Sequence, residues 1–281
     1  MKINYIDIHS HVQDSAFNTD RDAVIVRMEE AGVATITIGT GIETSRNAVQ
    51  LADTHTHIYA TVGLHPVDDA REEFNAAEYE VLARHERVVA IGECGLDYHY
   101  IETFFEKDKV EKGISWNKDA EADRQKRFFE EQIELAVRVG KPLMLHGRPS
   151  PHTMDAYEDM CDILANAQIQ YGERVRGNFH FFCGDVRIAR RVLDLGFTMS
   201  FPGVITFASQ YDEVVQFAPL DSIHGETDAP YAAPKPFRGT RNEPIHVREV
   251  YRKIAALRGL DDEVVRMALL QNAVRVFGLT V

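Results

Sequence analysis

The chain has 281 residues, of which 44% are hydrophobic and 27% are charged, a composition typical of a folded protein with a large core. Its formal net charge of −13 argues against broad electrostatic adhesion to nucleic acid, which needs a field of Lys and Arg, although divalent cations in a pocket could still attract a phosphate. The sequence contains no run of about 18 apolar residues and no signal-peptide pattern, so we expect a cytoplasmic protein without a membrane span.

Apolar runs of strand length alternate with longer segments of helical period along the chain. We predict strands at residues 5–8, 35–38, 58–62, 88–91, 143–145, 177–179, 198–201 and 222–225. We predict helices at residues 20–31, 45–52, 76–84, 122–139, 154–170, 187–195, 245–258 and 262–277. Eight strands in this alternation predict an α/β fold, a (β/α)8 TIM barrel that forms one domain over residues 1–281. A doubly wound open sheet is the alternative.

Residues 101–119 fit neither pattern. They are polar, they carry Lys107, Lys109 and Lys112, and they hold the only tryptophan, Trp116. We predict a long inserted loop after the fourth strand, and loops of this length are usually functional or mobile. A solvated surface loop without a role is the alternative.

Residues that can bind a metal follow most of the predicted strands. Active sites of (β/α)8 barrels lie at the carboxyl ends of the strands. The candidate ligands at these ends are His9, His11, Glu93, His146, His180 and Asp228. Imidazole and carboxylate groups suit zinc, manganese, cobalt, nickel or magnesium. The sequence therefore predicts a site for two divalent metal ions at one mouth of the barrel.

The spacing of His9 and His11 supports this prediction. Residues two apart in an extended segment point the same way, so both imidazoles can reach one ion. His55 and His57 have the same spacing. They precede the third strand, however, at the other end of the barrel, and we interpret them as surface residues.

Glu93 and Asp228 are the candidate catalytic residues. A carboxylate that bridges two ions holds them about 3.5–4 Å apart, and we assign this role to Glu93; pairing with an arginine is the alternative. A carboxylate at the edge of the metal site can orient and deprotonate the attacking water, and we assign this role to Asp228. Asp228 as a simple ligand remains the alternative.

Three further residues border the predicted site. His65 follows the third strand and is a candidate contact for a substrate phosphate, or else a structural histidine. Arg148 could clamp a phosphate through two hydrogen bonds, or pair with a carboxylate. Glu226 is interpreted as a residue that orients a ligand rather than as a ligand itself.

Seven segments, in order along the whole chain, resemble the motifs of the TatD-like deoxyribonucleases. They are His9-Ser10-His11, Gly63-Leu64-His65-Pro66, Gly92-Glu93-Cys94-Gly95-Leu96-Asp97-Tyr98, His146-Gly147-Arg148, His180-Phe181-Phe182-Cys183-Gly184, Glu226-Thr227-Asp228-Ala229-Pro230 and Arg238-Gly239-Thr240-Arg241-Asn242-Glu243-Pro244. Each motif alone is modest, and together they are highly specific.

The resemblance implies a TIM-barrel hydrolase of the amidohydrolase-like group that cleaves phosphodiester bonds of DNA. It also implies how the ligands are divided: His9, His11 and Asp228 on one ion, His146 and His180 on the other, and Glu93 between them. His65 would lie near the substrate phosphate. The chain departs from the family in the long stretch after Tyr98, in the prolines that follow Arg148, and at Phe181. The first two departures border the site and concern the choice of substrate.

Three functions follow from these observations. The first is a deoxyribonuclease. The second is a small-molecule hydrolase on the same metal site, such as a lactonase, an amidase or a phosphoesterase, which the acidic composition favours. The third is a non-catalytic metal-holding protein, against which the intact ligand set argues. The expected partner is DNA or a small phosphoester substrate, and no protein partner is evident.

Overall fold

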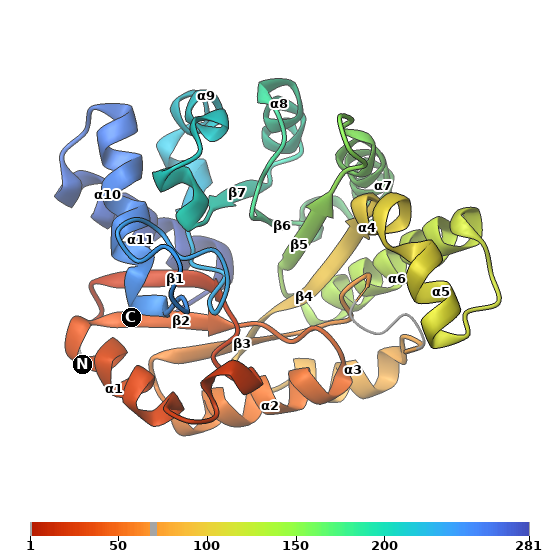
Figure 1. Cartoon of the computed structure of the whole chain (residues 1–281), viewed down its shortest axis with the longest axis horizontal. Helices are drawn as coiled ribbons and strands as arrows, with labels where there is room; N and C mark the ends of the chain where they lie inside the picture. Colours follow the sequence, from red (N-terminus) through yellow and green to blue (C-terminus); the bar gives the residue numbers. More distant parts are fainter. Residues whose placement is uncertain (1, 68–71, 281) are drawn as a thin grey trace.

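In a computed structural model that describes residues 2–67 and 72–280, eight parallel strands follow one another around one sheet in chain order (Figure 1). They are β1 (Tyr5–Ser10), β2 (Val33–Thr37), β3 (Ile58–Val62), β4 (Val88–Asp97), β5 (Leu143–Arg148), β6 (Gly177–His180), β7 (Thr198–Phe201) and β8 (Ile223–Gly225). This order confirms the (β/α)8 barrel, because a doubly wound sheet reverses its strand order at a switch point.

Helices surround the strands and cover the outside of the barrel (Figure 1). They are α1 (Arg21–Ala31), α2 (Ile42–Thr54), α3 (Ala76–Ala83), α4 (Tyr98–Thr103), α5 (Phe105–Lys112), α6 (Lys118–Val139), α7 (Asp155–Tyr171), α8 (Val186–Asp194), α9 (Asp212–Phe217), α10 (Val247–Arg258) and α11 (Asp262–Phe277). No helix in the described ranges is long and apolar enough to cross a membrane.

Every residue of β2, β3, β4, β6, β7 and β8 is buried. Parallel strands covered on both faces read as continuous apolar runs, which is why the sequence pattern located them. The main core joins strands to the surrounding helices. A smaller core packs Ile6 and Ile8 of β1 against Ala273 and Phe277 of α11.

The barrel is joined between β8 and β1 by side chains as well as by backbone. The backbone bridge pairs Ser10 with Ala229, just after β8. The Tyr251 hydroxyl of α10 donates to the carbonyl of Ile6 at 2.8 Å and accepts from its amide at 3.4 Å. The carboxylate of Asp7 accepts from the amide of Thr227 at 2.8 Å and from its hydroxyl. We call this junction the β1/β8 seam.

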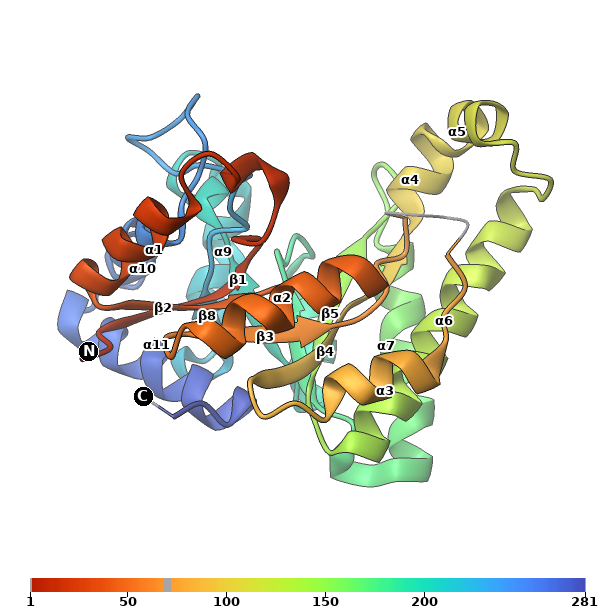
Figure 2. The ribbon, with the colours of Figure 1, turned by 90° about the horizontal axis from the view of Figure 1, so that it is seen from below.

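The predicted loop at residues 101–119 is wrong as a description of local structure. The segment contains the second half of α4, all of α5 and the start of α6, which project at the end of the barrel where β4 finishes (Figure 2). Ile101 and Phe105 lie four residues apart and are both buried, as the i, i+4 spacing of a helix allows. The charged run that follows, residues 106–112, hid this short apolar face from the sequence pattern.

Candidate metal centre

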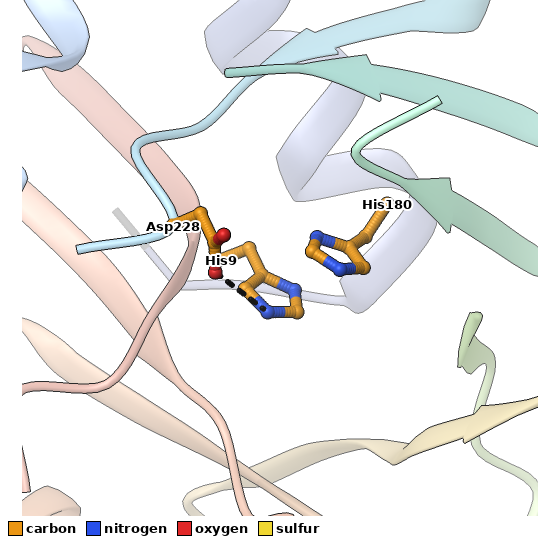
Figure 3. Close-up of side chains that lie close together, drawn as sticks. All are labelled: His9, His180 and Asp228. Atoms are coloured by element: carbon orange, nitrogen blue, oxygen red, sulfur yellow. Dashed lines mark ion pairs between the residues drawn. The ribbon is translucent and has the colours of Figure 1, made fainter. Parts of the chain in front are cut away.

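The six predicted ligands lie together at the carboxyl end of the barrel. His9 and His11 come from the end of β1, Glu93 from β4, His146 from β5, His180 from β6, and Asp228 from the segment after β8. Figure 3 shows Asp228 beside His9, with the rings of His9 and His180 side by side. These two rings are stacked, with centroids 3.6 Å apart.

Glu93 lies at the centre of the cluster. One of its carboxylate oxygens is 3.0 Å from Nδ1 of His146 and 3.1 Å from Nε2 of His180. The other is 3.3 Å from Nε2 of His9. Burial by itself raises the pKa of this carboxyl, but the surrounding imidazoles outweigh burial and hold the pKa well below its usual range. Glu93 is therefore an anion that faces three imidazoles at once.

Close backbone approach on both sides of Glu93 explains its glycine neighbours. Gly92 and Gly95 have φ angles of 146° and 143°, which side-chain-bearing residues rarely adopt. A Cβ at Gly92 would lie 2.3 Å from the carbonyl oxygen of Met144, and one at Gly95 would lie 2.0 Å from that of His146. The glycines therefore let β4 continue against β5 to Asp97, six residues past the predicted end at Ile91.

His9 is fully buried, and neither of its ring nitrogens has a hydrogen-bond partner among the described residues. Burial, assisted by repulsion from His180, lowers its pKa to about 3. The ring is therefore neutral, the form in which imidazole binds a metal. An unsatisfied buried polar group is costly unless something pairs with it. A cation bound by this ring would remove that cost.

Asp228 is held in an unusual backbone conformation. Its φ is 54°, in the left-handed region where Asp is tolerated better than most residues. Its amide donates to the carbonyl of His9 at 2.9 Å. One oxygen of its carboxylate lies 3.4 Å from Nε2 of His11. The same oxygen lies 3.8 Å from Nε2 of His9 (Figure 3). The seam of the barrel thus places this carboxylate over the His9–His11 pair.

Two further carboxylates contact the ring nitrogens of His180 and His146 that do not face Glu93. Glu226 lies 3.2 Å from Nδ1 of His180, as expected for an orienting residue, and accepts from the hydroxyl of Ser200 at 2.5 Å. Asp97 lies 3.1 Å from Nε2 of His146. We did not predict a role for Asp97, although it lies in the TatD-like motif that contains Glu93. Its position four residues after Glu93 was the available signal.

Three groups of side chains each bring ligand atoms within 4.8 Å of one another. They are His9, His180 and Asp228; His9, His11 and Glu93; and His65, Glu93 and His146. His9 belongs to the first two groups and Glu93 to the last two, as expected for a cluster that could hold more than one ion. They do not coincide with the division of ligands that the family resemblance implies, because His180 groups with His9 and His65 groups with His146.

A cavity of about 530 Å³ opens directly over this cluster. The two predicted substrate contacts, His65 and Arg148, both line it. Nε2 of His65 lies 3.7 Å from a carboxylate oxygen of Glu93, whereas the Arg148 side chain is exposed and forms no ion pair with a described carboxylate. The structure therefore brings both residues to the same cavity, with His65 deep beside the carboxylate and Arg148 nearer the solvent.

Comparison with known proteins places this geometry in a family. The family model described as TatD related DNase matches residues 6–278. The chain is 37% identical to the metal-dependent hydrolase YabD of Bacillus subtilis, with 96% of this chain and 98% of that one covered. It is 34% identical to the metal-dependent hydrolase TatD of Mycobacterium tuberculosis, with 98% of each chain covered. The crystal structure of YjjV, a TatD homologue from Escherichia coli, superposes with a TM-score of 0.83 at 28% identity over the full length of both chains.

A (β/α)8 barrel with histidines and carboxylates converging at the ends of its strands defines a metal-dependent hydrolase, and these relatives agree with that class. The chain belongs to the TatD family. It is therefore an enzyme that acts by hydrolysis, and the prediction of a non-catalytic protein is excluded.

Proposed function

We propose that this protein is a deoxyribonuclease that cleaves phosphodiester bonds of DNA with two divalent ions. His9, His11, Glu93, His146, His180 and Asp228 would hold the ions, with Glu93 shared between them. When bound, the ions supply positive charge that polarises the phosphate and makes a water easier to deprotonate near neutral pH. The identity of the ions is open among magnesium, manganese, zinc, cobalt and nickel.

The observation that carries the proposal is the position of Glu93. A buried carboxylate that faces three imidazoles from three other strands is expected where cations bind, because each oxygen is directed at a different part of the cluster. The buried His9 ring, which has no hydrogen bond to a described residue, fits the same interpretation. The name of the matching family model supports DNA as the substrate.

We assign the other groups by their place in the cavity. Asp228 stands at the edge of the cluster beside His9 and His11, where the carboxylate oxygen that does not face these imidazoles can accept the proton of the attacking water. His65 and Arg148 both line the cavity and would bind the phosphate oxygens. The exposed guanidinium of Arg148 offers paired N–H groups that match a phosphate.

The proposal is tested with purified protein and single-stranded DNA labelled at one end. We expect cleavage with at least one of the five ions, none with excess EDTA, and a loss of about 100-fold or more in Asp228→Asn, because removal of the proton acceptor eliminates general base catalysis. The control is Asp53→Asn, which alters an exposed carboxylate before β3, at the other end of the barrel. Equal nuclease activity in wild type and Asp228→Asn would identify a contaminant and contradict the proposal.

A small-molecule hydrolase on the same metal site is the second candidate. The cavity volume of about 530 Å³ lies within the range of small-molecule pockets, and the net charge of −13 disfavours long polyanions. A panel of lactones, amides and simple phosphoesters separates the two functions. Turnover of one of these with no cleavage of DNA under any ion would favour the second candidate.

A further inference from the structure

One stretch of this acidic chain has the opposite charge. Residues 231–241, which we call the rim segment, contain Lys235, Arg238 and Arg241 and no Asp or Glu. The segment begins three residues after Asp228 and projects from the same end of the barrel as α4 and α5 (upper part of Figure 2). The positive charge therefore lies at the same end of the barrel as the cavity, in a protein whose net charge is −13.

The rim segment is held in place at several points. The side chain of Asn242 donates to the carbonyls of Thr227 and Tyr231, at 2.8 and 2.7 Å. Arg241 is occupied by two bonds of 2.7 Å to the carboxylate of Asp20. The ring of Phe237 stacks on His246, with centroids 3.9 Å apart. A surface positioned in this way loses little freedom when it binds a ligand.

The other two cations of the segment are directed to solvent. Lys235 and Arg238 are exposed, and neither forms an ion pair with a described carboxylate. The guanidinium of Arg238 lies over the ring of Phe207, 3.7 Å from its centroid. The amide of Lys235 donates to the hydroxyl of Thr206 at 2.9 Å. The Arg238 guanidinium and the Lys235 backbone are thus held against the segment that follows β7, and both side chains are exposed to a ligand.

Tyr231 connects the rim segment to the cavity. It lines the cavity, its side chain is 59% exposed, and its ring meets that of His11 edge to face at 6.2 Å. The rim segment therefore begins at an exposed aromatic ring in the cavity wall and carries Lys235 and Arg238 four and seven residues further along the chain. Proteins that bind single strands combine aromatic rings for the bases with cations for the phosphates in this way.

We propose that the rim segment binds the part of a single-stranded nucleic acid that extends beyond the cavity, with Arg238 and Lys235 on backbone phosphates and Tyr231 against a base. This inference rests on the proposed nuclease function and names how that substrate is held. Arg238 stacked on Phe207 directs its N–H groups outward in a fixed plane, which suits a phosphate. The chain therefore has a short local path for the strand in place of a broad basic surface.

The test measures the binding of a fluorescent single-stranded oligonucleotide of about 12 nucleotides, a length that covers one such site. All proteins carry Asp228→Asn and are loaded with manganese, so that the strand is bound and not cleaved. We compare this background with the added pair Lys235→Gln and Arg238→Gln. The matched control adds Arg174→Gln, because Arg174 is exposed and packs on the ring of Tyr171 but lies before β6, at the other end of the barrel.

We expect the added pair to raise Kd about tenfold near 0.15 M salt and to reduce the slope of log K against log salt by about 1.4, since each phosphate contact on a single strand contributes about 0.7. Arg174→Gln should leave both quantities unchanged, and Arg238→Lys should keep most of the slope. Unchanged binding in the added pair would overturn the inference even if the wild type cleaves DNA. Binding that depends on Lys235 and Arg238 in an enzyme that cleaves no DNA would support the inference and contradict the proposed function.

Discussion

His146, like His180, has a carboxylate at each of its ring nitrogens. Glu93 lies at Nδ1 and Asp97 at Nε2, at 3.0 and 3.1 Å. Burial by itself lowers the pKa of this imidazole, but hydrogen bonds to Asp97 and Glu93 outweigh burial and raise the pKa to about 9. Asp97 touches the reaction only through this ring, so we regard it as a positioning residue.

We expect Asp97→Asn to lower metal affinity or activity by about 10- to 100-fold, the usual effect of losing a carboxylate behind a histidine ligand. Titration of manganese, followed by activity at saturating metal, distinguishes weaker binding from misplacement of the ring. Asp159→Asn is the control, because Asp159 contacts Tyr98 and Lys126 and no residue of the cluster. Equal metal affinity and activity in Asp97→Asn and wild type would contradict the proposal that Asp97 positions the His146 ring.

A second residue-scale prediction concerns His224 of β8. Burial lowers the pKa of this imidazole to about 3, and its Nε2 lies 3.0 Å from the Thr198 hydroxyl. The unfolded chain binds a proton below about pH 6.5 and the folded chain does not. His224 therefore stabilises the fold fully above pH 6.5, and that contribution decreases as pH falls toward 3.

Between pH 7.5 and 5 the wild type should lose about 2 kcal/mol more stability than His224→Gln, whose side chain does not titrate. Urea unfolding at the two pH values measures both losses. A variant at the half-buried His99, His99→Gln, should behave like the wild type. Parallel losses in His224→Gln and wild type would show that the imidazole is protonated in the folded protein.

At the level of single residues, the sequence pattern predicted the candidate ligands that follow directly after a predicted strand. It missed Asp97, because β4 is longer than predicted and ends at this residue. His9, His146 and His180 stand where apolar runs stop, so their positions follow from period and placement alone. Asp97 was missed because β4 continues through Gly92 and Gly95, and this continuation depends on contacts with β5 that are distant in sequence.

At the scale of elements, a buried ionic network in α6 anchors Trp116, near the end of the segment that was predicted as a loop. The carboxylate of Glu121 accepts from the side chains of Arg124, Gln125 and Trp116, at 2.7 to 3.2 Å. Arg124 also donates to the carbonyl of Pro66 at 2.6 Å, beside His65. Gln125 accepts from the amide of Asp97 at 2.8 Å, so the network joins α6 and the chain preceding it to the ends of β3 and β4. Such pairings between distant segments are invisible to a reading of local periodicity.

Glu121→Gln should lower the free energy of unfolding by about 3–5 kcal/mol, because it leaves the buried charge of Arg124 without its carboxylate. The same substitution should shift the emission of Trp116 to longer wavelength, since the indole loses its charged acceptor and becomes more exposed to water; Trp116 is the only tryptophan. Urea unfolding and fluorescence spectra check both effects. Glu131→Gln, which alters the exposed pair with Arg127, is the control and should change little. An unshifted spectrum with wild-type stability would contradict this account of the network.

At the scale of the whole molecule, the order of strands followed from the sequence but the closure did not. Alternation of strand and helix patterns predicts a sequential parallel barrel. It does not say how β8 meets β1. At the β1/β8 seam much of the bonding comes from Tyr251, Asp7 and Thr227, whose partners are more than 200 residues away in the chain. Side-chain contacts between residues so far apart in the chain leave no local pattern in the sequence from which they could be predicted.

Tyr251→Phe tests the seam. The substitution keeps the ring and removes a hydroxyl that bonds both the amide and the carbonyl of Ile6. We expect a loss of about 1–3 kcal/mol, the cost of leaving buried backbone groups unpaired. Urea unfolding measures it, with Tyr171→Phe, in the half-buried last residue of α7, as the control. Equal stability of the two variants would show that the seam does not depend on this hydroxyl.

The seam also has a consequence for biosynthesis. The groups that surround His9 come from nearly the whole length of the chain, since Glu93, His180 and Asp228 lie 84, 171 and 219 positions further on. A chain growing on a ribosome therefore lacks a complete cluster until residue 228 has emerged, late in translation. Products that terminate before that residue cannot form the site, however well their first strands fold. Catalytic competence is thus acquired in one step near the end of synthesis, and partial chains should be inert.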